Sequence, residues 1–234
     1  LMMLDLIANN NWKRPIYFSG GAYDDEDFLW MKNYLQLDGM TYKLVPIKTE
    51  IPKDASPLEM GGIDTDKMYA NVMKWDWGNS ESLSIYHDPE TRKNSITYRS
   101  YLSRLMNQLI LEGKKEKAKN IITLAMNKMP LEQFGYYSLL EPFAKGYYDL
   151  GENAKAQDLL SKLILKYKEN LKYYSSLTPS DQTSLAIDII TDIERYRSLL
   201  LVMKESGDVT FYNKNKAQFN TYVSIFERFG REKE

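Results

Sequence analysis

The chain of 234 residues contains no cysteine and a single histidine. Without cysteine it forms no disulfide, offers no thiolate nucleophile and builds no cysteine-ligated zinc site. With one histidine, a site made of several histidines is excluded, and a Ser-His-Asp triad would depend on His87 alone. Because His87 directly precedes a turn at Asp88-Pro89, we interpret it as a hydrogen-bonding loop residue rather than a catalytic base.

Long apolar runs and an excess of one charge are also missing. No run approaches the ~18 residues that a membrane-spanning helix needs, and the opening residues do not form a signal-peptide pattern. The net charge of -1 gives no general field that would attract nucleic acid, so we expect no nucleic-acid partner. Because Leu1–Ile7 already has a helical pattern, we expect the chain to be a piece of a longer protein.

The sequence shows no catalytic constellation. Gly20-Gly21 lies between an expected strand and an expected helix, as a phosphate-binding loop would. The Gly-x-Gly-x-x-Gly spacing is absent, however, and the four acids at 24–27 would repel a phosphate. These acids suit the first turn of a helix better than a metal site, since consecutive carboxylates cannot all converge on one ion. We therefore expect no catalytic residue, no metal and no cofactor, and predict that this chain is not itself an enzyme.

A short pattern that occurs twice indicates the architecture. Gly113 precedes Ala118 by five residues, and Gly151 precedes Ala156 by the same spacing. The first copy continues to Pro130, which matches the second half of a tetratricopeptide repeat, whereas the second copy is degenerate. Such a repeat is a helical hairpin that buries its apolar face by stacking on a neighbour. The predicted fold class is therefore mainly α, with tetratricopeptide-like stacked helical hairpins and a small N-terminal α/β portion.

The chain is expected to have three parts. Residues 1–50 form a small α/β cap, residues 51–94 form a linker with one helix, and residues 95–234 form the tetratricopeptide-like hairpins. Within the cap and linker we predict, in order, a helix that ends at 9–11, a strand at 14–19, a helix at about 25–35, a strand at 42–47 and a helix from 64 or 65 to about 75. The predicted hairpin helices cover about 95–112, 114–128, 134–150, 152–172, 180–203 and 210–229.

Aromatic residues provide the binding candidates. Trp75 and Trp77 flank an Asp, and such a pair can either form a platform that stacks on a sugar ring or anchor the linker on the repeats. The 18 tyrosines suit half-buried repeat surfaces. The first helices of the hairpins would form a concave binding face. Helical phase places five residues on that face: Tyr101, Asn107, Tyr137, Glu141 and Tyr148.

Lysines form two clusters. They lie at positions 114, 115, 117 and 119 and again at 162, 166, 168 and 172. Together with nearby tyrosines they could hold an anionic polymer, but we interpret them as the solvated faces of two helices.

Three segments carry a family resemblance. They are IANNNWKRPIYF at 7–18, NYLQLDGMTYKLVPI at 33–47 and IDTDKMY at 63–69, and Trp77-Gly78 follows in the same order. They resemble the segment after the last membrane span in a large Bacteroidetes family of polytopic membrane proteins of unknown function. That family is related to protein O-mannosyltransferases and to a vertebrate membrane O-mannosyltransferase with C-terminal tetratricopeptide repeats. The resemblance extends over roughly residues 1–175.

The resemblance implies a specific place for this chain. The parent would be a membrane glycosyltransferase that uses a lipid-linked sugar donor, and the chain would be its C-terminal domain on the extracytoplasmic, periplasmic face. The catalytic carboxylate of such enzymes lies in an early loop, so no catalytic residue is transferred to this sequence. The expected partners are the membrane-embedded part of the parent and acceptor proteins or glycans. Two alternatives stay open: a free-standing tetratricopeptide-type adaptor, and a carbohydrate-binding module that uses Trp75 and Trp77.

Overall fold

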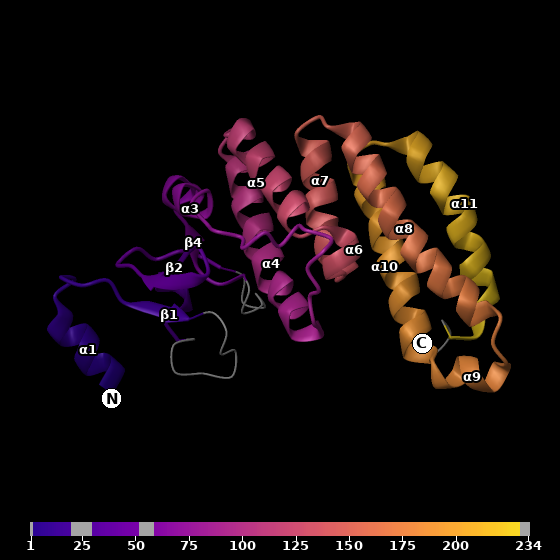
Figure 1. The fold of residues 1–234 in the computed structure, drawn as a ribbon, viewed down its shortest axis with the longest axis horizontal. Helices are drawn as coiled ribbons and strands as arrows, with labels where there is room; N and C mark the ends of the chain where they lie inside the picture. Colours follow the sequence, from indigo (N-terminus) through magenta and orange to yellow (C-terminus); the bar gives the residue numbers. More distant parts are fainter. Residues whose placement is uncertain (1, 20–29, 52–58, 230–234) are drawn as a thin grey trace. The chain divides into compact units, whose positions relative to one another are not determined.

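The computed structural model describes residues 2–19, 30–51 and 59–229 (Figure 1). The chain divides into two compact units, residues 1–135 and residues 136–234. Helices dominate both units, and unit 1 adds a small sheet (Figure 1). The structure thus confirms the predicted class, mainly α with a small N-terminal α/β portion.

The sheet of unit 1 has four short strands in the order β1-β3-β2-β4. The third strand pairs antiparallel with the first and the second, and the fourth lies parallel to the second. Alternate residues of the two central strands are buried, which gives the sheet one apolar face. The strands are β1 Tyr17–Ser19, β2 Leu35–Asp38, β3 Thr41–Leu44 and β4 Gly62–Ile63.

The prediction for the segment before β2 is partly wrong. We expected a helix to about Leu35, but Lys32–Tyr34 forms the single 3-10 turn η1 and Leu35 begins β2. Leu35 and Leu37 are buried and alternate with half-buried residues, so the period is that of a strand. Residues 20–29, which include the glycine pair and the acidic run, lie outside the described part of the chain.

The helices around the sheet begin and end largely where the sequence indicates. Helix α1, Met2–Asn10, ends where Asn11 takes a left-handed φ of 45°, as expected for asparagine. Helix α3, Thr65–Val72, begins at Asp64, whose side chain accepts a hydrogen bond from the Lys67 amide. The segment that we expected to be a linker therefore contributes β4 and α3 to the packed unit 1.

The first helical hairpin belongs to unit 1. Helix α4, Pro89–Leu111, packs against α5, Lys115–Lys128. Between them Gly113 has a φ of 73°, and the Lys114 amide donates to the Leu109 carbonyl at 2.8 Å. This is the Schellman geometry that ends a helix and reverses the chain. Ala118 of the repeated pattern is fully buried.

Two further hairpins form unit 2. Helix α7, Glu141–Asp149, packs against α8, Asn153–Ser175, and α10, Ala186–Glu205, packs against α11, Val209–Ile225. Gly151 and Gly207 each have a φ of 77°. In both turns the following amide donates to a carbonyl five residues earlier, as in the first hairpin. The third hairpin keeps this turn although its sequence has lost the glycine-to-alanine spacing.

Two of the expected helices are divided. Residues 134–150 are not one helix, because α6, Leu131–Phe134, ends at Gly135 and is followed by the 3-10 helix η3, Tyr137–Leu140, and then by α7. Tyr136 has a left-handed φ of 49°, which no helix interior accepts. Residues 180–203 are divided at Leu185 into α9, Pro179–Ser184, and α10. A last 3-10 helix, η4, covers Glu227–Phe229.

Candidate functional site

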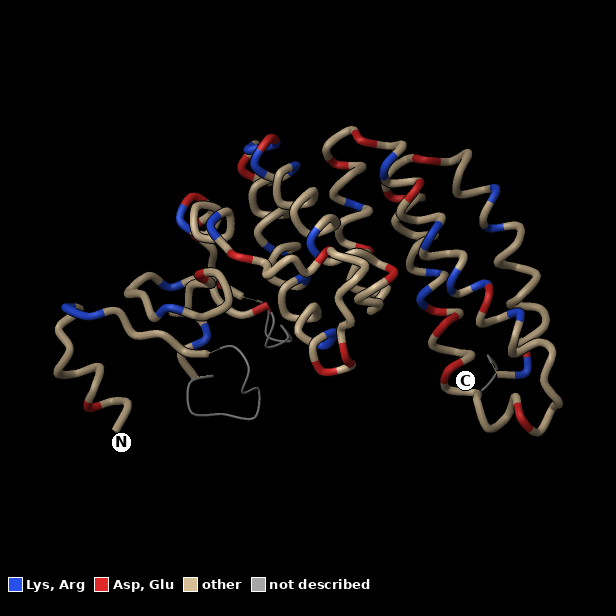
Figure 2. The backbone as a smooth tube through the Cα atoms, viewed as in Figure 1, with Lys and Arg blue, Asp and Glu red and all other residues tan. Residues whose placement is uncertain are grey.

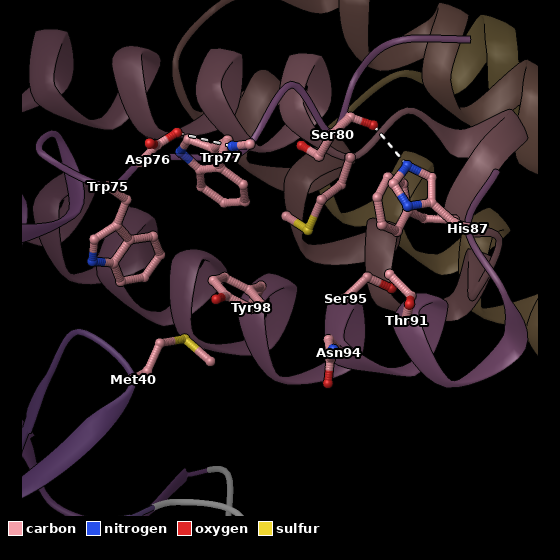
Figure 3. Close-up of a pocket in the computed structure, with 13 residues that line it drawn as sticks. Met40, Trp75, Asp76, Trp77, Ser80, His87, Thr91, Asn94, Ser95 and Tyr98 are labelled. Atoms are coloured by element: carbon pink, nitrogen blue, oxygen red, sulfur yellow. Dashed lines mark hydrogen bonds between the residues drawn. The ribbon is translucent and has the colours of Figure 1, made fainter. Parts of the chain in front are cut away.

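Unit 1 contains a cavity of about 390 Å³ beside α4. Its walls come from the turn after β2, the segment that follows α3, the first half of α4 and the ends of α5 and α6 (Figure 3). Its volume lies near the lower end of the range of about 300–1,000 Å³ that is typical of small-molecule sites. The lining residues are Met40, Trp75, Asp76, Trp77, Gly78, Ser80, His87, Thr91, Asn94, Ser95, Tyr98, Met129 and Phe134.

Three aromatic rings form one wall of this cavity (Figure 3). The ring centroids of Trp75 and Trp77 are 5.7 Å apart, and each lies 5.4 Å from the ring of Tyr98 on α4. Separations of this size mean that the rings are in direct contact. The tryptophan pair therefore anchors its segment on α4, and it also faces the cavity. Neither Tyr98 nor Met40 was singled out from the sequence.

His87 and Ser80 lie at the other end of the cavity (Figure 3). The imidazole of His87 packs on Phe134 with a centroid distance of 4.5 Å, and its Nε2 donates to the Ser80 carbonyl oxygen at 2.8 Å. The Ser80 hydroxyl donates in turn to the Lys128 carbonyl at 2.7 Å. His87 thus holds the loop in place, which confirms the hydrogen-bonding role that we expected for it.

Several polar groups at the cavity keep hydrogen-bonding capacity. The Tyr98 hydroxyl and the Asn94 amide make no hydrogen bond within the described part of the chain. Asp76 uses Oδ1 to accept from the Gly78 amide at 2.9 Å, which leaves Oδ2 available. The buried Nε1 of Trp77 finds no acceptor among the described residues, a state that costs about 1–3 kcal/mol. No Lys or Arg is among the described residues that line this cavity.

The five residues expected on a concave face have different environments. Tyr101 is fully buried and packs on the ring of Tyr42 at 5.8 Å, so it presents nothing to a partner. Tyr148 is also buried, and its hydroxyl donates a hydrogen bond to the Asp208 carboxylate at 2.8 Å. Burial and this neighbouring carboxylate raise the pKa of Tyr148. For these two tyrosines the placement on a binding surface is wrong, because the apolar side of each helix turns them into the core.

The other three residues of that set differ in exposure. Glu141 accepts a hydrogen bond from the Ser198 hydroxyl at 2.5 Å, and burial raises its pKa. Tyr137 is half-buried in η3, and Asn107 is exposed on α4. Asn107 lies at a second cavity of about 580 Å³, which α4 lines together with β4 and its neighbours. Asn107 is thus the exposed member of these five residues.

Five of the eight lysines in the two clusters pair with carboxylates: Lys114, Lys117, Lys119, Lys162 and Lys166. Lys114 and Lys117 reach Asp66 of α3 at 2.8 and 2.6 Å. Hydrogen bonds from these two lysines lower the pKa of Asp66 to about 2. Lys162 and Lys166 pair with acids of their own helix at 2.9 and 3.3 Å. Basic and acidic positions lie close together along α5 and α8 (Figure 2), in line with these ion pairs.

The described part of the chain offers neither a metal-binding cluster nor a membrane-spanning helix. Within residues 2–19, 30–51 and 59–229, no group of three or more acidic or histidine side chains is arranged to hold a metal ion. The helices of these same segments include none with the length and apolarity that a bilayer crossing requires.

Comparison with known proteins gives one match. A family model described as TMEM260-associated domain 2 matches residues 1–67, which span α1, the sheet and the start of α3. Neither a curated protein nor a solved structure matches the chain. The cap and the beginning of α3 are therefore similar to a domain that is associated with TMEM260.

Proposed function

We propose that this chain is a non-catalytic part of a longer, TMEM260-type membrane glycosyltransferase related to protein O-mannosyltransferases. It would lie on the extracytoplasmic side, dock on the membrane-embedded part and present an acceptor protein to it through tetratricopeptide-like hairpins. The observation that carries this proposal is that the segment similar to the TMEM260-associated domain shares one core with the first hairpin.

The contacts between the two parts are specific. Tyr42 of β3 packs edge-on against Tyr101 of α4, and both side chains are fully buried. Arg104 of α4 donates through Nη2 to the Gly61 carbonyl at 2.9 Å. The Thr65 hydroxyl at the start of α3 donates to the carboxylate of Glu112 at 2.6 Å. Core packing and polar contacts of this kind hold the first hairpin in a fixed position on the matched segment, as a presenting domain requires.

The proposal can be tested in the whole membrane protein that contains this chain. Removal of residues 136–234 should reduce sugar transfer to a folded protein acceptor and leave transfer to a short unfolded peptide unchanged, because the peptide needs no presenting surface. Both proteins must reach the membrane in equal amounts. Equal loss with both acceptors, or no loss with either, would refute acceptor presentation.

Two milder variants guard against misfolding of the truncated protein. Asn107→Ala changes an exposed side chain in unit 1, and Tyr137→Ala changes a half-buried side chain in unit 2. Each substitution, tested by itself, should weaken acceptor binding without changing the thermal unfolding of the isolated chain. Unchanged acceptor affinity would remove the substituted residue from the proposed surface.

A further inference from the structure

We propose that the cavity beside α4 is a binding site for a single neutral pyranose unit of a glycan, with the Trp75–Trp77–Tyr98 wall as its stacking platform. The site lies wholly in unit 1, and the inference does not depend on acceptor presentation by the hairpins. Three properties of the cavity point to this ligand class: its aromatic wall, its unused polar groups and its charge.

The aromatic wall favours a ligand that stacks on the rings over a cation that is enclosed by them. A cage for a quaternary ammonium group needs rings that stand apart, so that the cation fits between them within about 6 Å of each centroid. Here the three centroids are only 5.4 to 5.7 Å from one another, so the rings touch and leave no space for a cation between them. The ring planes are inclined to one another by 50–88°, so the face of one ring, rather than a flat three-ring surface, covers the apolar C–H face of a ring-shaped ligand.

The polar groups at the cavity suit hydroxyl groups. Asn94 offers an amide that both donates and accepts, Tyr98 offers a hydroxyl, and Asp76 offers a free carboxylate oxygen. A pyranose presents hydroxyls around the rim of its ring while its C–H face stacks, so one ligand can satisfy both features. The buried indole N–H of Trp77 is a further donor that lacks an acceptor within the described chain.

Charge and size exclude other ligand classes. A phosphorylated or carboxylated ligand would approach Asp76 without a lysine or arginine among the described lining residues to compensate. The volume of about 390 Å³ fits one or two ring units rather than an extended polymer. A proline-rich peptide would need an open groove along several turns, whereas this cavity is short and has the packed rings of His87 and Phe134 in its lining.

The test is a two-dimensional NMR titration that follows the four indole N–H signals of the intact chain. Methyl α-mannopyranoside and methyl β-glucopyranoside serve as probes, at up to about 20 mM, a concentration that nearly saturates a site with a Kd of about 1 mM. The signals of Trp75 and Trp77 should shift with saturation, whereas those of the exposed Trp12 and Trp30 should not move. Assignment uses one Trp→Phe variant for each signal.

Two variants and a matched control locate the site. Asn94→Ala and Tyr98→Phe each remove one unused polar group, and each should weaken sugar binding about five- to tenfold, the loss of one hydrogen bond. Asn120→Ala is the control, since Asn120 is an exposed asparagine of α5 that does not line the cavity. It should leave sugar affinity unchanged.

Absence of saturable shifts with both sugars, or affinity that none of the cavity variants changes, would overturn the proposal. Shifts of Trp75 and Trp77 with a proline-rich peptide but not with sugars would assign the cavity to peptide binding and overturn it as well. Because the acceptor experiment removes unit 2 and this cavity lies in unit 1, the failure of one proposal is distinguishable from the failure of the other.

Discussion

The close packing of the segment before β4 against β2 depends on one glycine, Gly61. Gly61 has a φ of 70°, and a Cβ added there would lie 2.7 Å from the carbonyl carbon of Leu35. Gly113 has nearly the same φ, 73°, but a Cβ added there would meet nothing within 4 Å. The two glycines therefore form a matched pair in which the backbone conformation is shared and the steric conflict is not.

The expected magnitudes follow from this difference. A left-handed residue with a Cβ costs about 1–2 kcal/mol, and the lower entropy of the unfolded chain returns about 0.4–1 kcal/mol. Gly113→Ala should therefore destabilise unit 1 by about 1 kcal/mol. Gly61→Ala adds the overlap with the β2 backbone, which costs a further ~1–3 kcal/mol, so its total is about 2–4 kcal/mol.

Urea unfolding followed by tryptophan fluorescence measures this effect in unit 1 alone. All four tryptophans, at positions 12, 30, 75 and 77, lie within residues 1–135, so the signal does not report on unit 2. Equal destabilisation by the two substitutions, within about 0.5 kcal/mol, would refute the assigned contact between Gly61 and β2. A larger effect of Gly113→Ala would refute the assigned open environment of the first hairpin turn.

Three further outcomes are expected. Hydrogen bonds from Lys114 and Lys117 lower the pKa of Asp66 to about 2. The Asp66 carboxylate therefore stabilises unit 1 above its unfolded pKa near 4, and this stabilisation is lost as the pH falls toward 2. Asp66→Asn should flatten this part of the pH profile of urea unfolding. Tyr148→Phe removes the hydrogen bond to Asp208 and should lower the stability of unit 2 by about 1 kcal/mol in a far-ultraviolet circular dichroism melt. Burial raises the pKa of Glu141. The folded state is therefore stabilised by the protonated carboxyl below the unfolded pKa, and this stabilisation is lost as the pH rises and the carboxyl ionises. Glu141→Gln should raise the melting temperature at pH 7 more than at pH 4.

The helical hairpins were predictable because their signals are local. Gly113 and Gly151 end helices through left-handed turns, and the alanines five residues later are buried. These features depend on a few neighbouring residues, and so they are visible in the sequence. The prediction was less successful at Gly135, where an apolar helical pattern continues across a break. The carbonyl of Gly135 accepts from the buried Arg99, a contact between residues 36 apart that no local pattern reveals.

Strand β2 illustrates the same limit. Its sequence Leu35-Gln36-Leu37-Asp38 is short enough to read as the end of a helix, and its pairing with β3 and β4 decides its conformation. The cavity likewise combines residues that are distant in sequence. Trp75 and Trp77 are recognisable as a pair, but the fold has to bring Met40, Tyr98 and Phe134 beside them.

The position of the cavity bears on which part of the chain determines its ligand. Of the described residues that line it, Met40 alone lies within residues 1–67, the segment similar to the TMEM260-associated domain. The aromatic wall and the unused polar groups come from the segment after α3 and from α4. The site is therefore a property of the junction between the cap and the first hairpin. A substitution on α4 can alter the ligand while the cap keeps its fold, because the cap contacts α4 through Tyr42 and Tyr101, which do not line the cavity.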